Sequence, residues 1–236
     1  MFDLDNTLHD ASHAAFGPTS AAMAEYMVGH LGMAPDDAAR LRQHYWNRYG
    51  ATLLGLVRHH AVNAAHFLEA THRHPGLEAR LRASRHDIAA LGRLKGRRYV
   101  LTNAPLAYTK RVLGTLRLTA LFDGVISIED MSMFGQLRPK PDARMFRHLA
   151  ASLRARPSDC VLVEDMLENQ KAARGIGMQT AWMQRYLDGR YRGHLRGGSQ
   201  SGSNAGFKRR EVGVHPCPSP RYVCAKIRSL QQLLTL

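Results

Sequence analysis

The stretch that decides the fold is Met1-Phe2-Asp3-Leu4-Asp5-Asn6-Thr7-Leu8, in which two aspartates follow an apolar start. Where a buried strand breaks into a loop, carboxylates with this spacing can converge on one ligand. The Asn6-Thr7 pair is turn chemistry and marks that break. Ionised carboxylates at the end of a buried strand are costly unless a metal or a reaction uses them. This stretch alone fits an active site and an acidic surface turn equally well, so the rest of the chain must decide.

The chain has 236 residues, of which 44% are hydrophobic, enough for one large domain or for a core domain with a smaller insert. No apolar run reaches the length of a membrane span, and the N-terminus lacks the order of a signal peptide. The cysteines Cys160, Cys217 and Cys224 have no metal-site spacing and are odd in number, which argues against a disulfide framework. We therefore expect a cytoplasmic protein with reduced thiols and no membrane partner.

The net charge is +14 and the isoelectric point is near 10.3, a balance that attracts phosphates, nucleotides or nucleic acid. Most of the excess lies late in the chain, since Asp188 and Glu211 are the only acidic residues after Arg185. Residues 188–214 combine this charge with glycine and serine, which predicts a flexible, basic loop. Such a loop could bind RNA or steer anionic nucleotides, but a solvated loop accounts for it more simply, so nucleic acid is not an expected partner.

Apolar residues recur at helical spacing over residues 11 to about 85, for example at Met23, Tyr26 and Met27. Breaks such as Gly32 divide this part into several helices, the last of which is expected over residues 77–94. Nothing in this range has the pattern of a strand.

The pattern changes at residues 95–97, after which short β-prone runs alternate with helical segments. This alternation predicts an α/β fold with a doubly wound parallel sheet. Residues 222–234 return to helical spacing and are expected to dock back on the sheet. The expected strands are 98–102, 125–127, 160–163 and 180–183, and the expected helices are 107–116, 142–153 and 167–176.

Parallel sheets bind ligands at the carboxyl ends of their strands, so chemistry is expected from the residues that follow each strand. Carboxylates, a hydroxyl and a lysine at one sheet edge are the parts that phosphoryl transfer requires. An aspartate can attack phosphorus, and two carboxylates from different strands can hold Mg²⁺. The residues that follow the strands are Asp3, Asp5 and Thr7, then Thr102 and Asn103, then Glu164 and Asp165, while Lys140 precedes an expected helix.

Four segments resemble, in this order, the motifs of haloacid dehalogenase superfamily phosphatases: Phe-Asp-Leu-Asp-Asn-Thr-Leu (2–8), Leu-Thr-Asn (101–103), Arg-Pro-Lys-Pro (138–141) and Val-Glu-Asp (163–165). The resemblance covers residues 2 to about 183 and implies a Rossmann-like core with an inserted α-helical cap. Residues 3–9, Arg48-Tyr49-Gly50 and residues 168–173 are similar to the pyrimidine 5′-nucleotidase branch. The implied activity is Mg²⁺-dependent hydrolysis of a small phosphorylated substrate, a nucleoside monophosphate such as UMP or CMP.

The resemblance also implies roles for the acidic residues. Asp3 would be the nucleophile and a Mg²⁺ ligand. Asp5 would protonate the leaving oxygen and then activate water, with its backbone carbonyl on the metal. Asp165 would be the other side-chain ligand of the metal, with Glu164 beside it or just behind it.

Substrate binding is implied for Thr102, Asn103 and Lys140, which would hold the phosphate, and Lys140 would also keep Asp3 ionised. Arg48 and Tyr49 are candidates for gripping a pyrimidine base, since an aromatic face stacks on a base and arginine can hydrogen-bond its carbonyl. The neighbouring Tyr45 and Trp46 have the spacing of cap-core residues and are expected to be buried. Four histidines of the expected cap could be considered as metal ligands, but their spacing matches no common zinc site, so they are expected at the surface: His59, His60, His72 and His74.

The expected boundaries are 1–10, 90–187 and 215–236 for the catalytic core, 11–89 for the cap and 188–214 for the basic loop.

Asp5 argues against a dehalogenase, since displacing halide needs no leaving-group acid. The cap has no lysine for phosphonate hydrolysis. A general or sugar-phosphate phosphatase or mutase stays open, as does a nucleic-acid-binding protein on an inactive scaffold, and the oligomeric state is not indicated. Only Met1 and Phe2 precede Asp3, whereas strands commonly have about five residues, so we expect further apolar residues upstream in the natural protein.

Overall fold

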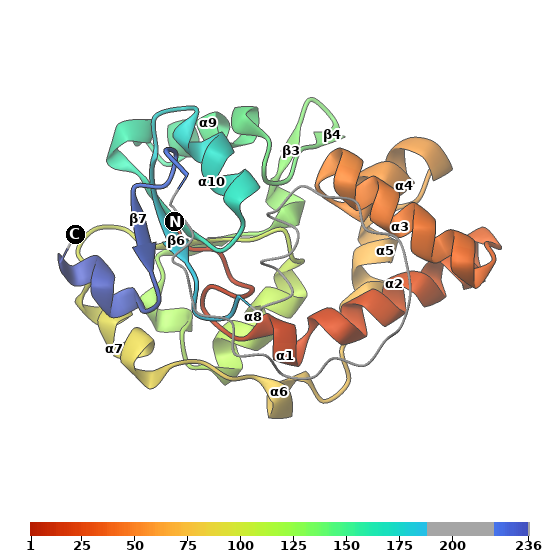
Figure 1. Ribbon diagram of the computed structural model, residues 1–236, viewed down its shortest axis with the longest axis horizontal. Helices are drawn as coiled ribbons and strands as arrows, with labels where there is room; N and C mark the ends of the chain where they lie inside the picture. The colour runs from red at the N-terminus through yellow and green to blue at the C-terminus, as the bar shows by residue number, and fades with distance from the viewer. Residues whose placement is uncertain (188–219, 236) are drawn as a thin grey trace, which may run out of the picture.

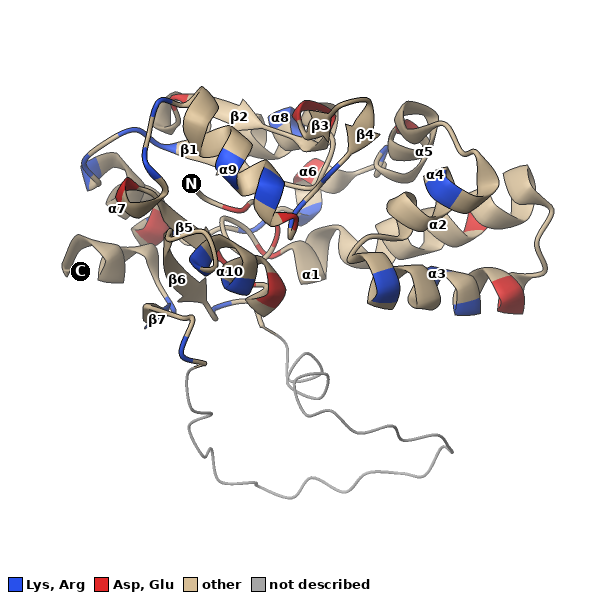
Figure 2. Cartoon of the chain, turned by 90° about the horizontal axis from the view of Figure 1, so that it is seen from above, with Lys and Arg blue, Asp and Glu red and all other residues tan. Residues whose placement is uncertain are grey.

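The computed structural model describes residues 1–187 and 220–235. A parallel sheet with helices on both faces forms the left part of the molecule in Figure 1, and helices α2 to α5 form the right part; Figure 2 shows the same division from above. The sheet contains β1 (Tyr99–Leu101), β2 (Gly124–Ile126), β5 (Val161–Glu164), β6 (Gln179–Met183) and β7 (Ala225–Ile227). All of these pairings are parallel, which confirms the predicted fold class.

The N-terminal segment lies at the centre of this sheet, between β1 and β5. Phe2 bridges Val100 on one side and Val163 on the other, both in parallel. Backbone hydrogen bonds join Phe2 N to Tyr99 O at 2.8 Å and Asp3 N to Val163 O at 2.9 Å. The strand order is therefore β2, β1, the N-terminal segment, β5, β6, β7, and Asp3 leaves the sheet at its middle.

The sheet is buried on both faces because successive side chains of a strand point to opposite sides. Phe2, Val100 and Val163 pack with α7 (Arg85–Arg93) and α8 (Leu106–Thr115) in one apolar cluster. Their chain neighbours Met1, Leu101 and Leu162 pack on the other face with α9 (Ala143–Ser152) and α10 (Leu167–Arg174). Because both faces are covered, β1 and the first three residues of β5 read as unbroken apolar runs.

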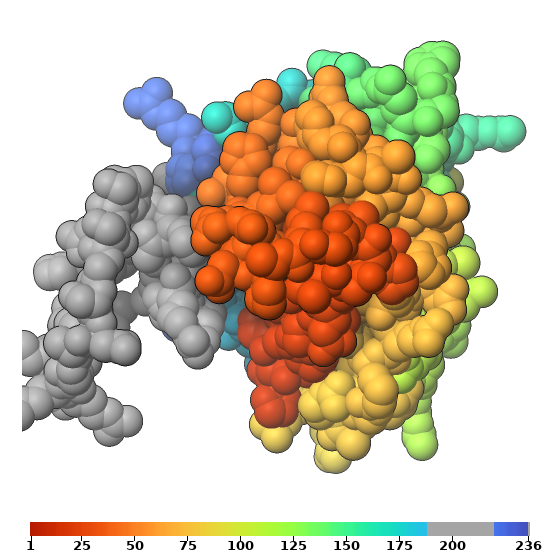
Figure 3. Space-filling view, turned by 90° about the vertical axis from the view of Figure 1, so that its right-hand side faces the viewer, coloured from red at the N-terminus to blue at the C-terminus, as the bar shows by residue number. Residues whose placement is uncertain are grey.

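The helical part has its own apolar core. It is built by α2 (Phe16–Leu31), α3 (Pro35–Tyr49), α4 (Thr52–His60) and α5 (Ala64–Thr71), which face the viewer in Figure 3. Ile128 and Leu137, which lie beyond β2, join the same cluster. An apolar contact therefore connects the helical part to the sheet domain. The short helix α1 (Ala11–Ala14) leads into α2.

The helix expected over residues 77–94 is wrong, because the chain forms α6 (Leu77–Arg80) and α7 with an extended break between them. Leu81 has φ −66° and ψ 130°, and the Ser84 hydroxyl accepts a hydrogen bond from Asp87 N at 3.3 Å. A serine that caps the new helix start competes with continuation of the old helix.

The C-terminal segment docks on the sheet as expected, but as a strand and a 3₁₀ helix rather than as an α-helix. β7 pairs with the open edge of β6, and η4 (Leu230–Thr235) follows it. The buried Asp87 carboxylate fixes this arrangement, because its Oδ1 accepts bonds from Ser229 Oγ at 2.6 Å and from Leu230 N at 2.8 Å. A small hairpin, β3 (Ser132–Met133) and β4 (Gln136–Leu137), was not predicted either.

The domain boundary expected at residue 89 falls inside α7, whose Ala90 and Leu91 pack with the sheet. We therefore propose that the cap consists of α2 to α5 and that the core resumes with α6. The basic loop expected at 188–214 lies outside the described residues. Within the described ranges, no helix is long and apolar enough to cross a membrane.

The packing of α3 against α4 yields a stability prediction at Gly55. A Cβ atom at Gly55 would lie 2.1 Å from Tyr45 Cγ, inside the ring of a buried residue. Gly55→Ala is therefore expected to destabilise the protein by about 1–3 kcal/mol in urea unfolding, because the ring must move. Gly29→Ala is the matched control, since nothing lies within 4 Å of a Cβ at this exposed helical position. The control should gain about 0.5–1 kcal/mol from helix propensity; equal stability of the two variants would contradict the packing.

Candidate active site

Asp3 lies at the middle of the sheet, where the central segment ends and the chain turns. The residue is buried, at 6% exposure, and its backbone is fixed by the ladder to β5. Asn6 adopts φ 58°, which turns the chain sharply after the aspartates. Leu8 N then bonds Leu4 O at 2.9 Å and closes the loop. The expected turn at Asn6-Thr7 is thus present, and it keeps Asp3 and Asp5 at the sheet edge.

Lys140 forms the centre of a buried ionic cluster. Its Nζ donates to Asp3 Oδ1 at 2.6 Å, to Glu164 Oε2 at 2.7 Å and to Leu101 O at 2.9 Å. All three protons of the ammonium therefore have acceptors. Burial alone would lower the pKa of Lys140, but the negative charges of Asp3 and Glu164 outweigh it and raise the pKa above its ordinary value. The side chain stays charged although it is only 3% exposed.

Asp3, Glu164 and Asp165 form the only group of potential metal ligands in the described part of the chain, with ligand atoms within 4.8 Å of one another. Burial, followed by the charge of Glu164, raises the pKa of Asp3 to about 7. The same two causes raise the pKa of Asp165 well above its ordinary value. Three carboxylates beside one ammonium leave a net charge of minus two when ionised, which a divalent cation would neutralise.

The donor set fits Mg²⁺, which prefers oxygen ligands and few carboxylates. Glu164 is already engaged at both oxygens, since Oε2 accepts from Lys140 and Oε1 accepts from Met166 N at 3.1 Å. Asp3 Oδ1 is shared with Lys140. The carboxylates of Asp3 and Asp165 are therefore better placed to hold a metal than Glu164, whose bonds orient Lys140.

Thr102 and Asn103 follow β1 at the same edge of the sheet. Thr102 is buried, and its Oγ1 accepts a bond from Ala104 N at 3.0 Å, which leaves its own O–H proton to donate. The Asn103 side chain binds the backbone of Lys140 twice, through Lys140 N at 3.0 Å and Lys140 O at 2.9 Å. The amide that is expected to bind phosphate thus also fixes the lysine loop. Sequence reasoning missed this clamp, because nothing local pairs residues so far apart in the chain.

Asp5 is held by two side chains that sequence reasoning gave no role. Its Oδ1 accepts a bond from Tyr108 Oη at 2.8 Å and lies 2.9 Å from His9 Nε2. Burial would raise the pKa of Asp5, but the contacts with His9 and Tyr108 outweigh burial and lower it. The spacing of four residues between Asp5 and His9 is a signal that could have been noticed. The contact with Tyr108 comes from α8 and has no local signal.

Arg48 and Tyr49 lie at the end of α3, away from the carboxylates. Tyr49 Oη is 2.6 Å from His59 Nε2 and receives a bond from Arg48 Nε at 3.1 Å. The next residue, Gly50, has φ 76°, and a Cβ there would lie 3.1 Å from Pro141 Cδ. The α3–α4 turn therefore lies close to Pro141, the residue that follows Lys140.

The predictions of burial for the other residues of the helical part are partly confirmed and partly wrong. Tyr45 is buried as expected, but Trp46 is 46% exposed because it lies on the outer side of α3, so its prediction as a core residue is wrong. Among the histidines, His59 is exposed, and His60 and His72 are half-buried. His74 is only 3% exposed, which contradicts the expected surface position. It is buried because the segment after α5 packs against Tyr108, with ring centroids 5.5 Å apart.

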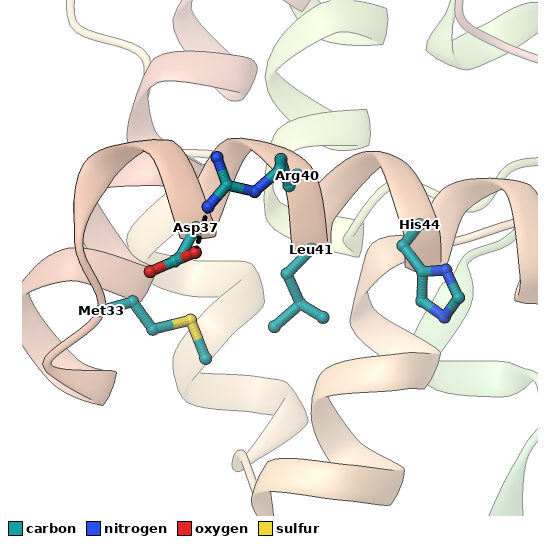
Figure 4. A pocket seen from close by; sticks show the side chains of 5 residues that line it. All are labelled: Met33, Asp37, Arg40, Leu41 and His44. Atoms are coloured by element: carbon teal, nitrogen blue, oxygen red, sulfur yellow. Dashed lines mark hydrogen bonds and ion pairs between the residues drawn. The ribbon is translucent and has the colours of Figure 1, made fainter.

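Two open hollows lie on the helical part rather than at the carboxylates. The first, of about 330 Å³, is lined by residues of α3 and its N-terminal loop, with Arg40 paired to Asp37 (Figure 4). It contains no residue of the buried cluster, and we assign it no role. The second, of about 410 Å³, adjoins the α3–α4 turn and is lined by Leu41, His44, Tyr45, Arg48, Tyr49, His59 and His60.

Comparison with known proteins identifies the family. Residues 1–177 match the haloacid dehalogenase-like hydrolases, and the chain belongs to this family. A HAD phosphatase from Thermococcus onnurineus is similar in structure, with a TM-score of 0.57 and 18% identity over 99% of this chain and 94% of that one. A putative HAD-hydrolase of Bacillus subtilis bound to magnesium gives a TM-score of 0.57 and 16% identity, over 99% and 95% of the two chains. CbbY from Rhodobacter sphaeroides, in complex with phosphate, gives 0.56 and 16%, over 98% and 94%.

Proposed function

We propose that this hydrolase is a Mg²⁺-dependent phosphatase that acts through an aspartyl-phosphate, and that its substrate is a pyrimidine nucleoside 5′-monophosphate. The observation that supports the phosphatase chemistry is the buried cluster at the sheet edge, where Lys140 bonds Asp3 at 2.6 Å and Asp165 lies within reach of the same metal position. Phosphoryl transfer needs a nucleophile, a counter-charge for the phosphate oxygens and an acid for the leaving group. The proposed roles assign these functions to Asp3, Lys140 and Asp5.

In the first half of the proposed reaction, an Asp3 carboxylate oxygen bonds to phosphorus while the bond from phosphorus to the ester oxygen breaks. Asp5 gives its proton to that ester oxygen, which leaves as an alcohol. In the second half, water attacks phosphorus and Asp5 takes a proton from it, so that Asp3 leaves as a carboxylate. When bound, Mg²⁺ supplies charge stabilisation to the phosphate oxygens. Thr102 and Lys140 would donate hydrogen bonds to those oxygens.

The proposed nucleotide selectivity depends on the α3–α4 turn. Gly50 lies close to Pro141, so Arg48 and Tyr49 are carried by the part of the cap that approaches the Lys140 loop. Arg48 lies over the Tyr49 ring, with 5.6 Å from Cζ to the ring centroid, and the adjoining hollow offers further aromatic and histidine side chains. An aromatic face with a neighbouring guanidinium suits a pyrimidine base. Closure of α2 to α5 over the sheet edge would exclude water from the reaction.

The family name includes dehalogenation, and Asp5 favours phosphate ester hydrolysis over it. Displacing a halide needs no proton donor, whereas an alkoxide leaving group does. Asp5 is fixed at the sheet edge by two hydrogen bonds, where it can serve as that proton donor. Phosphonate chemistry through a cap lysine is excluded, because no lysine occurs before Lys95.

The test is a screen of phosphate release over nucleoside 5′-monophosphates, sugar phosphates and p-nitrophenyl phosphate, with Mg²⁺ and with EDTA. We expect Mg²⁺-dependent turnover, with UMP and CMP preferred over purine nucleotides and sugar phosphates. Equal rates for all esters would leave a general phosphatase and remove the nucleotidase proposal. Transfer of the phosphoryl group to a second sugar phosphate would indicate a mutase. No release from any ester would overturn the phosphatase proposal as a whole.

A further inference from the structure

The side chain of Asp5 is fixed in an unusual way for a group that must exchange protons with substrate and water. Both of its hydrogen bonds go to Oδ1, from Tyr108 Oη at 2.8 Å and with His9 Nε2 at 2.9 Å. The carboxylate is 23% exposed, whereas His9 is fully buried behind it. Oδ1 is thus held on the protein side, and Oδ2 is left for substrate and water.

His9 is well placed to act as a fixed support. A backbone bridge joins Asp5 and His9, so the loop that carries one also carries the other. The opposite ring nitrogen, Nδ1, is buried and has no hydrogen-bond partner among the described residues. The tautomer with its proton on Nε2 explains both facts, because Nε2 then donates to Asp5 and Nδ1 leaves only a lone pair unpaired. The imidazole therefore serves Asp5 and no other group in the described structure except Tyr108, whose Oη lies 3.4 Å from Nε2.

Tyr108 is fixed in turn by the segment that returns from α5 to α6. The rings of His72 and His74 meet the Tyr108 ring edge-on, at centroid distances of 5.8 and 5.5 Å. Arg111, one turn further along α8, donates to the carbonyl of His74 at 3.2 Å. Tyr108 is 1% exposed, so its hydroxyl has little freedom to turn away from Asp5. The linker between cap and core therefore packs against Tyr108 and limits the movement of the phenol that hydrogen-bonds Asp5.

We propose that His9 and Tyr108 are positioning residues for Asp5, which keep its Oδ2 directed at the leaving oxygen in the first half-reaction and at water in the second. The inference rests on the phosphatase function proposed above and adds to it two residues that touch neither the phosphate nor the metal ligands Asp3 and Asp165. Each donor hydrogen-bonds Oδ1, and these bonds strengthen once Asp5 has given up its proton, because a charged acceptor binds more strongly than a neutral one. Loss of either donor frees the carboxylate to rotate.

The experiment measures the two half-reactions separately, by rapid quench, in Tyr108→Phe, His9→Ala and His9→Gln. The substrates are p-nitrophenyl phosphate, whose leaving group needs no proton, and an alkyl phosphate that the wild type hydrolyses. We expect phosphoenzyme formation from p-nitrophenyl phosphate to stay near the wild-type rate in all three variants. Formation from the alkyl phosphate and hydrolysis of the phosphoenzyme should each fall roughly 10- to 100-fold in His9→Ala, part of the acid–base contribution. KM should change little.

The remaining variants provide the conservative comparison. His9→Gln keeps an N–H donor near the Nε2 position, so both half-reaction rates should lie much closer to the wild type than in His9→Ala. Tyr108→Phe keeps the ring and loses only the hydroxyl. Tyr26→Phe is the matched control, since it removes a hydroxyl bonded to His66 Nδ1 at 2.9 Å in the helical part, and it should leave all rates unchanged. Thermal unfolding of each variant shows whether the fold is kept.

The outcomes separate the proposals. Equal slowing of both steps with both esters, or no recovery in His9→Gln, would assign His9 and Tyr108 a structural role and overturn the inference. Wild-type rates in all variants would overturn it as well, while the phosphatase function would stand. A wild-type protein that forms no phosphoenzyme from any ester would overturn the proposed function and this inference together.

Discussion

Asp3→Asn should abolish phosphate release and at the same time make the metal-free protein more stable at neutral pH. The amide cannot attack phosphorus, so no phosphoenzyme forms and turnover should fall by roughly 10⁴-fold or more, as for other covalent nucleophiles. The shape of the site is kept, because the amide oxygen can still accept the bond that Lys140 Nζ donates at 2.6 Å. Phosphate release and acid-quench trapping of labelled phosphoenzyme measure the loss; retained turnover would remove Asp3 from the nucleophile role.

The stability effect has a definite sign. The pKa of Asp3 is raised from 3.8 to about 7 in the folded protein, mainly by burial and by Glu164. The contribution of Asp3 to the stability of the wild type is therefore fully present below the unfolded pKa and is lost as pH rises from about 4 to about 7. Asparagine does not titrate. In EDTA, the free energy of unfolding of Asp3→Asn should exceed that of the wild type by an amount that grows over this pH range to a few kcal/mol.

Urea unfolding at several pH values in EDTA, and again with Mg²⁺, tests this relation. Mg²⁺ should stabilise the wild type more than Asp3→Asn, because a bound cation favours the ionised carboxylate. Asp36→Asn, at an exposed position in the first turn of α3, is the control and should follow the wild type at every pH. A stability difference between Asp3→Asn and the wild type that is constant over the pH range would mean that Asp3 is not the group destabilised by burial.

The position of Asp3 relative to Thr102 and Asp165 could be predicted because a parallel sheet determines it, whereas the place of Lys140 followed only from the resemblance of residues 138–141 to a family motif. The strands β1 and β5 are short, mostly apolar runs that are recognisable locally, and parallel strands bring their carboxyl ends to one edge whatever the loops do. The order of the segments along the chain was therefore sufficient to gather these residues. The helical character of residues 11–80 followed equally from local spacing.

Other features depend on contacts between residues far apart in the chain, which the local sequence does not indicate. The sequence of residues 222–234 has helical spacing, but the unpaired edge of β6 and the buried Asp87 turn it into a strand and a 3₁₀ helix. The burial of His74 and the bond from Tyr108 to Asp5 depend on which side of α8 meets the returning linker. Tertiary packing overrides local preference in these places, and pattern reasoning cannot find such contacts from one sequence.

Lys140→Met should act in the opposite direction to Asp3→Asn on stability, although both variants should lose activity. The methionine has similar length but leaves Asp3 and Glu164 buried without the ammonium that now lies 2.6 and 2.7 Å from them. Removing one partner of a buried ion pair costs about 3–5 kcal/mol, because the remaining charge is uncompensated. Lys110→Met, at an exposed position on α8, removes the same charge and should change the free energy of unfolding by less than about 0.5 kcal/mol.

The cause of this destabilisation can be separated from a simple packing defect. If uncompensated carboxylates are responsible, lowering the pH should restore part of the stability of Lys140→Met, since the pKa values of Asp3 and Asp165 are already raised by burial in the wild type. The double variant Asp3→Asn with Lys140→Met should also be more stable than the sum of the two single-variant effects predicts, because one buried charge is gone. A loss that is the same at every pH and unchanged by Asp3→Asn would show that Lys140 stabilises the fold by packing alone, and that the carboxylates owe their arrangement to the strands rather than to the ammonium between them.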